Sequence, residues 1–323
     1  MKKKYCELIF VFFLGVLLPG LIFSTLKAGA AGKPEPETQP SQPMQTEPQQ
    51  TVPVENPYLL PVLMADGTER EMELEAYLVG VILGEMPADF ETEALKAQAV
   101  VARTYALKRH IYGGKHNSAV CTDAACCQAY VSEEEYLRVG GQAEMVERIR
   151  QAVLETVGQV LTYNGELIDA TYFSCSGGRT EDAAAVWGAD VPYLKATDSP
   201  GEEAAAHYTD TVTFPAAQFT QTLGASNSQI GRVTYTAGGG VDTIEIGGVS
   251  YKGTTLRQML GLRSTAFVIT VVGDTVVITT KGYGHRVGMS QYGADAMAVQ
   301  GKTYEEILAH YYQGTVLRDF DSI

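Results

Sequence analysis

The chain has 323 residues, of which 45% are hydrophobic and 19% charged, so it can bury a substantial core. Lys and Arg number 24 against 38 Asp and Glu, which gives a formal net charge of -14 at pH 7. No dense basic run occurs beyond the extreme N-terminus, and this balance excludes nucleic acid as an expected partner.

The N-terminus predicts a membrane anchor. Three lysines precede an uncharged apolar run over residues 8–26, which is long enough for a helix to cross a bilayer. The lysines favour a cytoplasmic N-terminus, so the chain after Lys27 is expected outside the membrane. A cleaved signal peptide is the alternative, because small residues follow Lys27. We take residues 1–31 as the anchor; in both cases the bulk of the chain works beyond the membrane.

Residues 32–57 are rich in Pro, Gln, Glu and Thr and predict a solvated linker. A globular domain is expected over residues 58–318, because no Pro/Ser-rich break divides it. In its first half the sequence predicts a strand over residues 58–63 and helices over residues 71–83, 92–110 and 141–156.

The second half of this domain alternates apolar and polar residues as strands do. Strands are expected over residues 209–214, 233–236 and 242–246, a hairpin over residues 267–280, and a last helix over residues 294–300. Gly273-Asp274 is expected to form the hairpin turn. Helices early and strands late predict an α+β fold, with a helical N-terminal half packed on a strand-rich C-terminal half in one exported domain.

Glu85 lies at the end of a nearly unbroken apolar run, VGVILGEMP, where Pro87 must stop the preceding helix. At the negative end of a helix dipole and beside an apolar wall, the ionised form of a carboxyl is disfavoured. A general acid needs that property near neutral pH. The alternative is an exposed glutamate that follows a helix, and the local sequence alone favours it.

A histidine and three cysteines lie close together in the chain: His116, Cys121, Cys126 and Cys127. They supply the ligand types and the ligand number that a structural zinc ion takes. Disulfides are the default outside the cytoplasm, and with Cys175 two bridges are arithmetically possible. The spacing alone leaves metal and disulfides both open.

Two further segments are candidates for a binding surface. The run TYFSCSGGR places Ser174 and Ser176 on one side of an extended segment, before two glycines that favour a turn. A serine nucleophile is not supported, because the pattern is not G-x-S-x-G. In KGYGHRVGMSQYG, His285 and Gln291 are candidates to line a sugar-binding groove, and a structural histidine before a glycine-rich helix start is the alternative.

Four segments, in this order, resemble the stage II sporulation protein D family. They are LVGVILGEMPADFETEALKAQAVVARTYAL, TYFSCSGGRTEDAAAVWG, VPYLKATDSP and GYGHRVGMSQYGADAMAVQGKTYEEIL. The resemblance covers about residues 58–317, nearly the whole part expected outside the membrane. A membrane anchor is also the usual arrangement of that family.

The resemblance implies a peptidoglycan lytic transglycosylase that acts in engulfment during sporulation, beside an amidase/endopeptidase that first strips stem peptides from the glycan strands. Glu85 matches the catalytic acid of the family. It would protonate the oxygen of the MurNAc-β-1,4-GlcNAc bond and help the 6-hydroxyl of the same sugar attack C1, giving a 1,6-anhydro end. Related domains occur in modifiers of amidases, so a glycan-binding activator that does not cut is the alternative.

The resemblance also favours zinc over disulfides. Clostridial members bind zinc through two histidines and two cysteines. Here Cys121 and Cys127 match the cysteines, His116 lies close to one histidine, and Cys126 stands where the other is expected. A thiolate can replace an imidazole on zinc. The expected role is structural, and catalysis is expected to need no cofactor.

Six side chains are expected in the substrate groove: Lys96, Arg103, Tyr172, Ser174, Ser176 and Gln291. Lys96 and Arg103 have a structural alternative, in which they hold the loop around Glu85 in place. The sequence departs from the family at two positions. Arg286 stands where a glycine is common, and Cys175 stands where a small hydroxyl residue is frequent.

Overall fold

The computed structural model describes residues 57–116 and 119–323, which belong to one compact unit, Val54–Ile323. The predicted anchor, residues 1–31, and residues 32–56 of the predicted linker lie outside the described residues. Within the described ranges, no helix is long and apolar enough to cross a membrane.

The described residues form an α+β fold, as predicted. The helices are α1 Leu74–Glu85, α2 Thr92–Tyr112, α3 Glu133–Arg138, α4 Ala143–Leu154, α5 Ala183–Trp187, α6 Ala216–Leu223, α7 Gly253–Leu260, α8 Gln291–Val299 and α9 Tyr304–Tyr311, with single 3-10 turns at Glu202–Ala204 and Phe320–Ser322. The strands are β1 Leu59–Leu63, β2 Glu69–Glu73, β3 Val120–Cys121, β4 Gln159–Tyr163, β5 Glu166–Leu167, β6 Tyr172–Phe173, β7 Thr209–Pro215, β8 Ile230–Tyr235, β9 Val241–Ile246, β10 Val249–Lys252, β11 Ala266–Val272, β12 Thr275–Lys281, β13 Met289–Ser290 and β14 Val316–Asp319.

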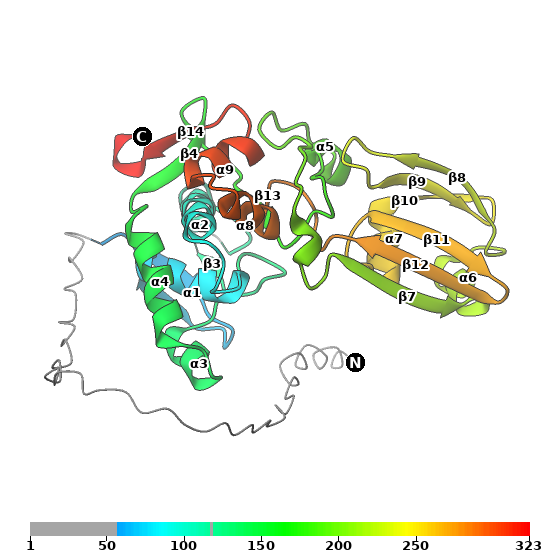
Figure 1. Ribbon diagram of the computed structural model, residues 1–323, viewed down its shortest axis with the longest axis horizontal. Helices are drawn as coiled ribbons and strands as arrows, with labels where there is room; N and C mark the ends of the chain where they lie inside the picture. The colour runs from blue at the N-terminus through cyan, green and yellow to red at the C-terminus, as the bar shows by residue number, and fades with distance from the viewer. Residues whose placement is uncertain (1–56, 117–118) are drawn as a thin grey trace, which may run out of the picture. The chain divides into compact units, whose positions relative to one another are not determined.

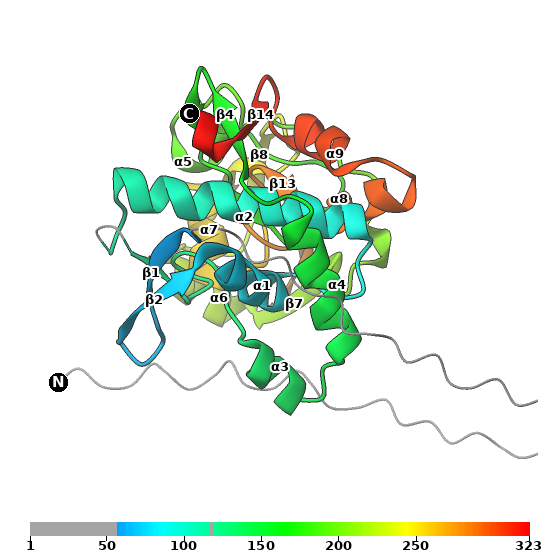
Figure 2. The same cartoon turned by 90° about the vertical axis from the view of Figure 1, so that its left-hand side faces the viewer.

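The larger hydrophobic core surrounds α2. Helices α1, α4, α8 and α9 and strand β4 all pack against it, and Figure 2 shows α2 between α1 and α9. Small side chains such as Ala99, Ala102 and Ala106 are fully buried along α2, which lets the neighbouring backbones come close. Because α8 and α9 belong to this core, the last part of the chain completes the region that the first part begins (Figure 1).

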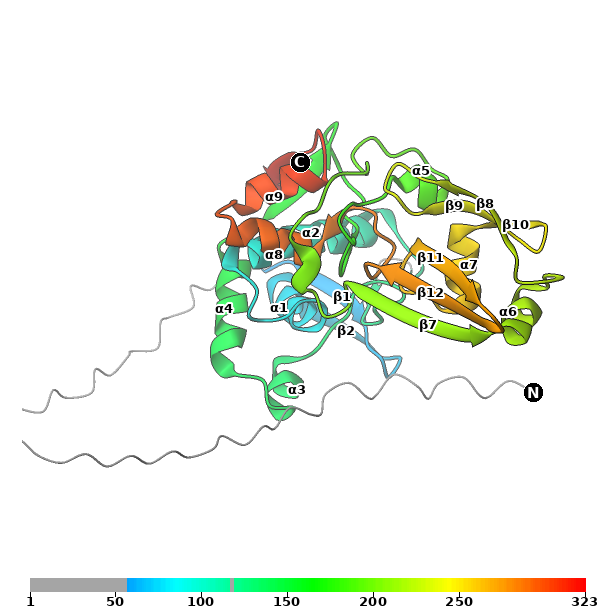
Figure 3. The same cartoon turned by 45° about the vertical axis from the view of Figure 1, so that its right-hand side comes forward.

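A second hydrophobic core lies in the strand-rich part. It forms between two antiparallel sheets, β10-β9-β8 and β11-β12-β7, and includes Phe219 of α6 and Leu256 of α7. Helix α7 packs on β9 and β10, and α6 packs on β7 and β12 (Figure 3). The predicted hairpin is confirmed as β11 and β12, with Gly273 at φ 57°, a left-handed conformation that glycine adopts without strain.

The helix predicted over residues 71–83 begins later than expected, at Leu74. Residues 69–73 form β2, which pairs antiparallel with β1 so that Leu59 faces Glu73. In β2 the partly buried Met72 packs on the larger core while its charged neighbours are exposed, a two-residue alternation that suits a strand. The helices predicted over residues 92–110 and 141–156 are confirmed as α2 and α4.

The helices α3, α5, α6, α7 and α9 were not predicted from the sequence. The signal for α9 was present as a capping box, in which Thr303 and Glu306 each accept a hydrogen bond from the backbone N–H of the other. The parallel pairing between β6 and β13 was not predicted either, because two-residue strands have no periodicity to detect. This pairing positions the candidate site.

Candidate active site

Glu85 is the last residue of α1, and a neighbouring loop passes unusually close to it. A Cβ atom at Gly84 would lie 2.9 Å from the backbone nitrogen of Tyr130. Backbone cannot yield as a flexible side chain can, so a glycine at this position lets the segment 128–130 run against the end of the helix. The close approach brings the Ala129 N–H to the Glu85 carboxylate.

Three donors reach the Glu85 carboxylate. The Ala129 N–H donates to Oε1 at 2.6 Å, and the Tyr172 hydroxyl donates to the same oxygen at 3.3 Å. The Gln291 amide donates to Oε2 at 3.4 Å. The two side-chain contacts are long for hydrogen bonds, so Glu85 receives one firm donor and two weak ones.

Burial raises the pKa of Glu85 above its ordinary value, because the ionised carboxylate loses solvating water. The three donors favour the ionised form and lower the pKa, but they offset the effect of burial only in part. The position at the carbonyl end of α1 also disfavours a negative charge. Glu85 therefore keeps its proton at a higher pH than an exposed glutamate does.

A row of polar groups fixes the direction of the Tyr172 hydroxyl. The Tyr77 hydroxyl donates to Oε1 of Gln128 at 3.3 Å, and the Gln128 amide donates to the Tyr172 oxygen at 3.0 Å. Burial raises the pKa of both tyrosines well above the usual value, so both phenols keep their protons. With its oxygen occupied by Gln128, Tyr172 directs its own proton to Glu85.

The parallel pairing of β6 with β13 delivers the other two side chains. Met289 is paired with Tyr172 and Ser290 with Phe173, and α8 begins at the next residue, Gln291. Ser290 caps this helix by accepting a hydrogen bond from the Gly293 N–H at 3.2 Å. Tyr172 and Gln291 thus reach Glu85 from two adjacent strand ends.

A second carboxylate, Glu202, which was not predicted from the sequence, holds these two segments together. The residue is 1% exposed. Its Oε1 accepts from the hydroxyls of Ser199 at 2.7 Å and Ser290 at 2.5 Å. Its Oε2 accepts from the Ser176 hydroxyl at 2.7 Å and from the backbone N–H groups of Ser176, Gly177 and Gly178 at 3.0, 2.8 and 3.2 Å. An acidic PGEE run predicts a solvent-exposed turn, so no sequence signal pointed to this role.

The two serines expected in the groove have different surroundings. Ser176 is fully buried and donates to Glu202, so its hydroxyl cannot contact a substrate, and that expectation is wrong in structural terms. Ser174 is partly exposed, and its carbonyl accepts a hydrogen bond from the Tyr292 N–H at 3.1 Å. It stays a candidate for substrate contact.

Lys96 and Arg103 lie on α2 in ion pairs and do not contact Glu85. The Arg103 side chain is 0% exposed and binds both oxygens of Glu75, at 2.9 and 2.5 Å. Lys96 bridges Glu93 at 2.9 Å and Glu155 at 2.6 Å. These contacts match the structural alternative, and both residues are left out of the candidate site.

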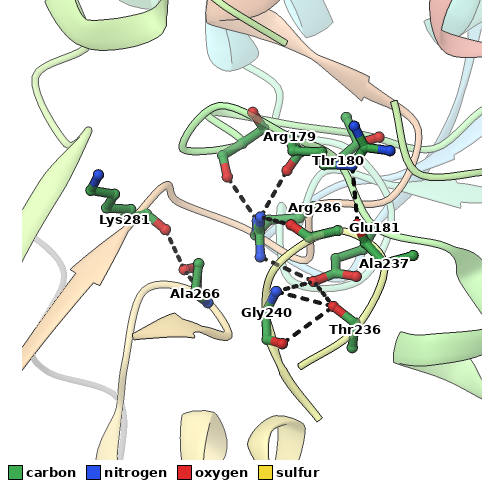
Figure 4. Close-up of polar contacts among 12 residues, drawn as sticks. Arg179, Thr180, Glu181, Thr236, Ala237, Gly240, Ala266, Lys281 and Arg286 are labelled. Carbon is green, nitrogen blue, oxygen red and sulfur yellow. Dashed lines mark hydrogen bonds and ion pairs between the residues drawn. The ribbon is translucent and has the colours of Figure 1, made fainter. Parts of the chain in front are cut away.

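Arg286, where the family commonly has glycine, has a left-handed backbone with φ 66°. Its guanidinium is 2% exposed and pairs with Glu181 at 3.1 Å, as Figure 4 shows. The same guanidinium donates to backbone carbonyls of Ser176, Arg179 and Gly238. Glycine would adopt this φ without strain, whereas the arginine offsets the strain by linking the TYFSCSGGR segment to the strand-rich part.

His285 has partners that fit the structural alternative. Its ring contacts Phe173 and Trp187, at centroid distances of 5.5 and 5.2 Å, and its Nδ1 accepts from the Val287 N–H at 3.1 Å. Burial, together with the nearby Arg257 charge, lowers the pKa of His285 to about 4. The ring is therefore neutral near pH 7. Because Phe173 and Tyr172 alternate along β6, the His285 ring is on the opposite side of that strand from Glu85.

The cysteine and histidine side chains expected to bind zinc converge. One ligand atom from each of His116, Cys121, Cys126 and Cys127 lies within 4.8 Å of the others, and these are free thiols rather than disulfides. The N–H groups of Cys126 and Cys127 both donate to the Asp123 carbonyl, a turn that directs two adjacent thiols to one centre. Three sulfurs and one nitrogen in this arrangement fit a four-coordinate soft cation.

The site as a whole presents one proton-holding acid with three donors around it. Of the side chains predicted to serve it, the structure brings Tyr172 and Gln291 to Glu85. Gln128 and Ala129 were not predicted, because their contribution depends on the path of the loop rather than on residue type. Such a site can give a proton to a leaving oxygen and take one back.

The chain is similar in sequence to known proteins. A family model described as "Stage II sporulation protein" matches residues 67–163. The chain is 41% identical to stage II sporulation protein D of Bacillus subtilis (strain 168), over 83% of this chain and 81% of that protein. It is 40% identical to the protein of the same name from Bacillus amyloliquefaciens, with the same coverage. A protein named "Amidase enhancer" from Bacillus subtilis is 31% identical over 75% of this chain and 40% of its own length.

Proposed function

Because the chain belongs to the stage II sporulation protein D family, we propose that it is a lytic transglycosylase that cleaves MurNAc-β-1,4-GlcNAc bonds in peptidoglycan. The family and a relative named for amidase enhancement support a sporulation role at the cell wall. The specific reaction rests on one observation in the site. Glu85 is an acid whose pKa is raised by burial and whose carboxyl is oriented by Ala129, Tyr172 and Gln291.

In the proposed reaction the protonated Glu85 gives its proton to the glycosidic oxygen as the bond from C1 to that oxygen breaks. The 6-hydroxyl of the same MurNAc attacks C1 and returns a proton to the Glu85 carboxylate. The products are a 1,6-anhydro end and a free 4-hydroxyl on GlcNAc, and Glu85 ends as it began. An internal nucleophile removes the need for the second carboxylate that hydrolytic glycosidases use.

Tyr172 and Gln291 are proposed to orient the Glu85 carboxyl rather than to exchange protons with substrate. Both are weak donors to Glu85, so they limit the rise of its pKa without abolishing it. General acid catalysis of this kind requires the protonated form. Activity is therefore expected to fall as the pH rises through the raised pKa of Glu85.

The test is digestion of stem-peptide-free glycan strands, with products separated by chromatography and identified by mass. Wild type is expected to release 1,6-anhydro ends, and Glu85→Gln is expected to lower the rate by about 10²- to 10⁴-fold. Glu91→Gln is the matched control, because that glutamate is exposed and lies in the short segment between α1 and α2. Equal product from Glu85→Gln and wild type would contradict the proposal.

The relative named an amidase enhancer favours a second candidate, a glycan-binding protein that stimulates an amidase without cutting. The two functions separate in one experiment. If purified protein makes no anhydro ends but speeds stem-peptide removal by an added cell-wall amidase, and Glu85→Gln does so equally well, the second candidate holds. We also propose that an amidase of this kind is the partner that prepares the strands.

Zinc is proposed as a structural ion held by His116, Cys121, Cys126 and Cys127. When bound it would fix a loop that has little core of its own, and four protein ligands leave no position for substrate. The loop matters for Glu85 because Cys127 directly precedes Gln128 and Ala129. Those two residues orient the Tyr172 hydroxyl and the Glu85 carboxylate.

Metal analysis of protein purified under reducing conditions tests this proposal. About one zinc per chain is expected in wild type and in the control Cys175→Ser, whose thiol lies outside the cluster, and much less in Cys126→Ser. Chelation is expected to lower the melting temperature as well as the activity, since metal binding and folding are coupled. Wild type without metal, or Cys126→Ser with full metal content, would show that these residues do not bind zinc.

The apolar run over residues 8–26 motivates the last part of the proposal, that the N-terminus anchors the protein in a membrane. The domain that carries Glu85 would then act outside the cytoplasm, facing the cell wall between the two membranes of a sporulating cell. Membrane fractionation with protease protection tests it. A domain that is digested only after the cell is lysed would exclude this placement.

A further inference from the structure

A cluster of aromatic rings and one arginine lies away from Glu85, on the far side of β6. It consists of Trp187 at the end of α5, Tyr283 and His285 after β12, and Arg257 on α7; we call it the Trp187 cluster. The Trp187 and Tyr283 side chains are 48% and 41% exposed. Two large aromatic rings this exposed are available to stack on a ligand.

The contacts within the cluster join three separate segments. The rings of Trp187 and His285 lie 5.2 Å apart, and the Gly284 N–H between Tyr283 and His285 donates to the Arg263 carbonyl at 3.1 Å. That carbonyl follows α7, whose residue Arg257 lies near enough to lower the pKa of His285 through its charge. The segment after β12 is thus held between α5 and the end of α7.

Arg263 and Arg257, the two arginines of this region, differ in whether their charge is paired. Arg263 is paired with Asp210 at 3.1 Å and lies over the Tyr283 ring at 5.0 Å. Arg257 is partly buried, and among the described residues its guanidinium has no hydrogen bond or ion pair. An uncompensated, partly buried cation is unusual in a chain with a net charge of -14. It is a ready partner for an anion.

The surroundings of Arg257 indicate which kind of anion would bind there. Its neighbour His285 is neutral near pH 7, because burial lowers the pKa of that ring to about 4, so the local positive charge comes from the arginines. A guanidinium binds a carboxylate through two parallel hydrogen bonds. A carboxylate on a ring-shaped, otherwise uncharged body would place its charge on Arg257 and its flat face on Trp187 or Tyr283.

We propose that the Trp187 cluster is a binding site for a sugar that carries a carboxylate, with Arg257 as the anion-binding residue and Trp187 and Tyr283 as stacking rings. The choice of ligand rests on the proposed function, since each MurNAc of a stripped glycan strand carries a free lactyl carboxylate. A stem peptide is attached to that carboxylate as an amide, so stripping restores the charge that Arg257 would bind.

The cluster can bind a different sugar of the same strand than the one cleaved at Glu85. Phe173 contacts His285 while Tyr172, its neighbour in β6, contacts Glu85. The Glu85 site and the Trp187 cluster therefore lie on opposite faces of the same β-strand, β6. A glycan strand bound at both sites would be held through a carboxylate at the Trp187 cluster and cleaved at Glu85.

The chain has one tryptophan, so its fluorescence reports directly on this cluster. The full-length protein is titrated with N-acetylmuramic acid, with its methyl ester, and with N-acetylglucosamine. A saturable change is expected with the free acid, with affinity at least about tenfold weaker for the two uncharged sugars. Equal affinity for the acid and its methyl ester would overturn the proposal without reference to any variant.

Substitutions of Arg257 test whether this residue binds the carboxylate. Arg257→Met is expected to weaken binding of the free acid by about tenfold or more and to bind the ester as wild type does. The control is Arg232→Met, at an exposed arginine of β8, which should bind the acid normally. Arg257→Lys keeps the charge and is expected to bind with intermediate affinity. Unchanged binding by Arg257→Met, with its fold verified by circular dichroism, would refute the role of Arg257.

Glu85→Gln separates this inference from the proposed function. Its fluorescence titration is expected to match wild type even when it forms no anhydro ends. If wild type also forms none but discriminates acid from ester, the site stands and the transglycosylase reaction fails. If wild type cleaves strands and shows no such discrimination, the reaction stands and the site fails.

Discussion

Glu85, which is partly buried, and Glu202, which is fully buried, are two glutamates with opposite surroundings. Glu202 is enclosed by hydroxyl and backbone donors on both oxygens, with distances mostly below 3.0 Å. Glu85 has one donor at 2.6 Å and two beyond 3.2 Å. A carboxylate saturated with donors serves as a structural link, whereas one short of donors can hold a proton. The supply of donors, rather than burial alone, separates the two roles.

The strongest way to test this comparison is to remove the saturated carboxylate. Glu202→Ala leaves at least four buried donors without an acceptor and is expected to lower the free energy of unfolding by about 4 kcal/mol. Glu202→Gln keeps one acceptor oxygen, and the serine hydroxyls can reverse their roles, so a loss of about 2 kcal/mol is expected. Urea unfolding measures both.

The matched control is Glu203→Ala, at the exposed neighbouring glutamate, with an expected change within about 0.5 kcal/mol. If Glu202→Ala is no less stable than Glu203→Ala, the hydrogen bonds to Glu202 do not hold the fold together. The structural role assigned to Glu202 would then be wrong.

The second test removes a donor from the poorly supplied carboxylate. Tyr172→Phe deletes one hydrogen bond to Glu85, and kcat is expected to fall by about tenfold because the carboxyl is less well oriented. The lost donor had lowered the pKa of Glu85, so the alkaline limb of the pH profile is expected to move to higher pH. Steady-state rates across pH on stripped glycan strands measure both effects.

Tyr77→Phe is the companion variant, because its hydroxyl acts on Glu85 only through Gln128 and Tyr172. Its effect on kcat and on the alkaline limb is expected to be smaller than that of Tyr172→Phe. An alkaline limb that stays in place in Tyr172→Phe would mean that this hydroxyl does not influence the protonation of Glu85.

The smallest expected effect concerns stability at the site itself. Burial raises the folded-state pKa of Glu85 above its unfolded value, so the protonated acid stabilises the fold at low pH. That stability is lost as the pH rises through the raised pKa. Glutamine resembles the protonated acid, and Glu85→Gln is expected to be more stable than wild type at neutral pH, by up to about 1 kcal/mol.

The difference between Glu85→Gln and wild type should shrink as the pH falls below the unfolded pKa of a glutamate. Thermal unfolding at several pH values gives the result. If Glu85→Gln is less stable than wild type at neutral pH, the ionised Glu85 carboxylate is well solvated in the fold. The contrast between Glu85 and Glu202 would then be lost.

The sequence was sufficient for the parts of the molecule whose signals are local. Repeated apolar spacing predicted α2 and α4, and alternation predicted the β11-β12 hairpin. Pro87 predicted that the first helix stops just before it, and the predicted end at residue 83 lies two residues before the end of α1 at Glu85. The four zinc ligands that the resemblance implied also lie within one short segment, and their side chains converge. In each case the residues that interact are near one another in the chain.

The remaining parts depend on contacts between distant segments. Glu202 contacts Ser290 across 88 positions in the chain, and neither segment carries a local sequence pattern that predicts this contact. Arg103 and Ser176 have the residue types of a polar groove, and burial against Glu75 and Glu202 gives them structural roles instead. Residue type indicated what these side chains could do, whereas the tertiary fold decided what they contact.

The contact between Glu85 and Gln291 joins residues 206 positions apart, through the two-residue pairing of β6 with β13. Closing so long a loop has a large entropic cost, and contacts of this kind form late in folding. α8 and α9 pack on α2 in the larger core, so Gln291 reaches Glu85 only when the C-terminal part of the chain is in place. The candidate site is therefore completed by the last part of the chain, and a chain truncated before α8 would lack Gln291.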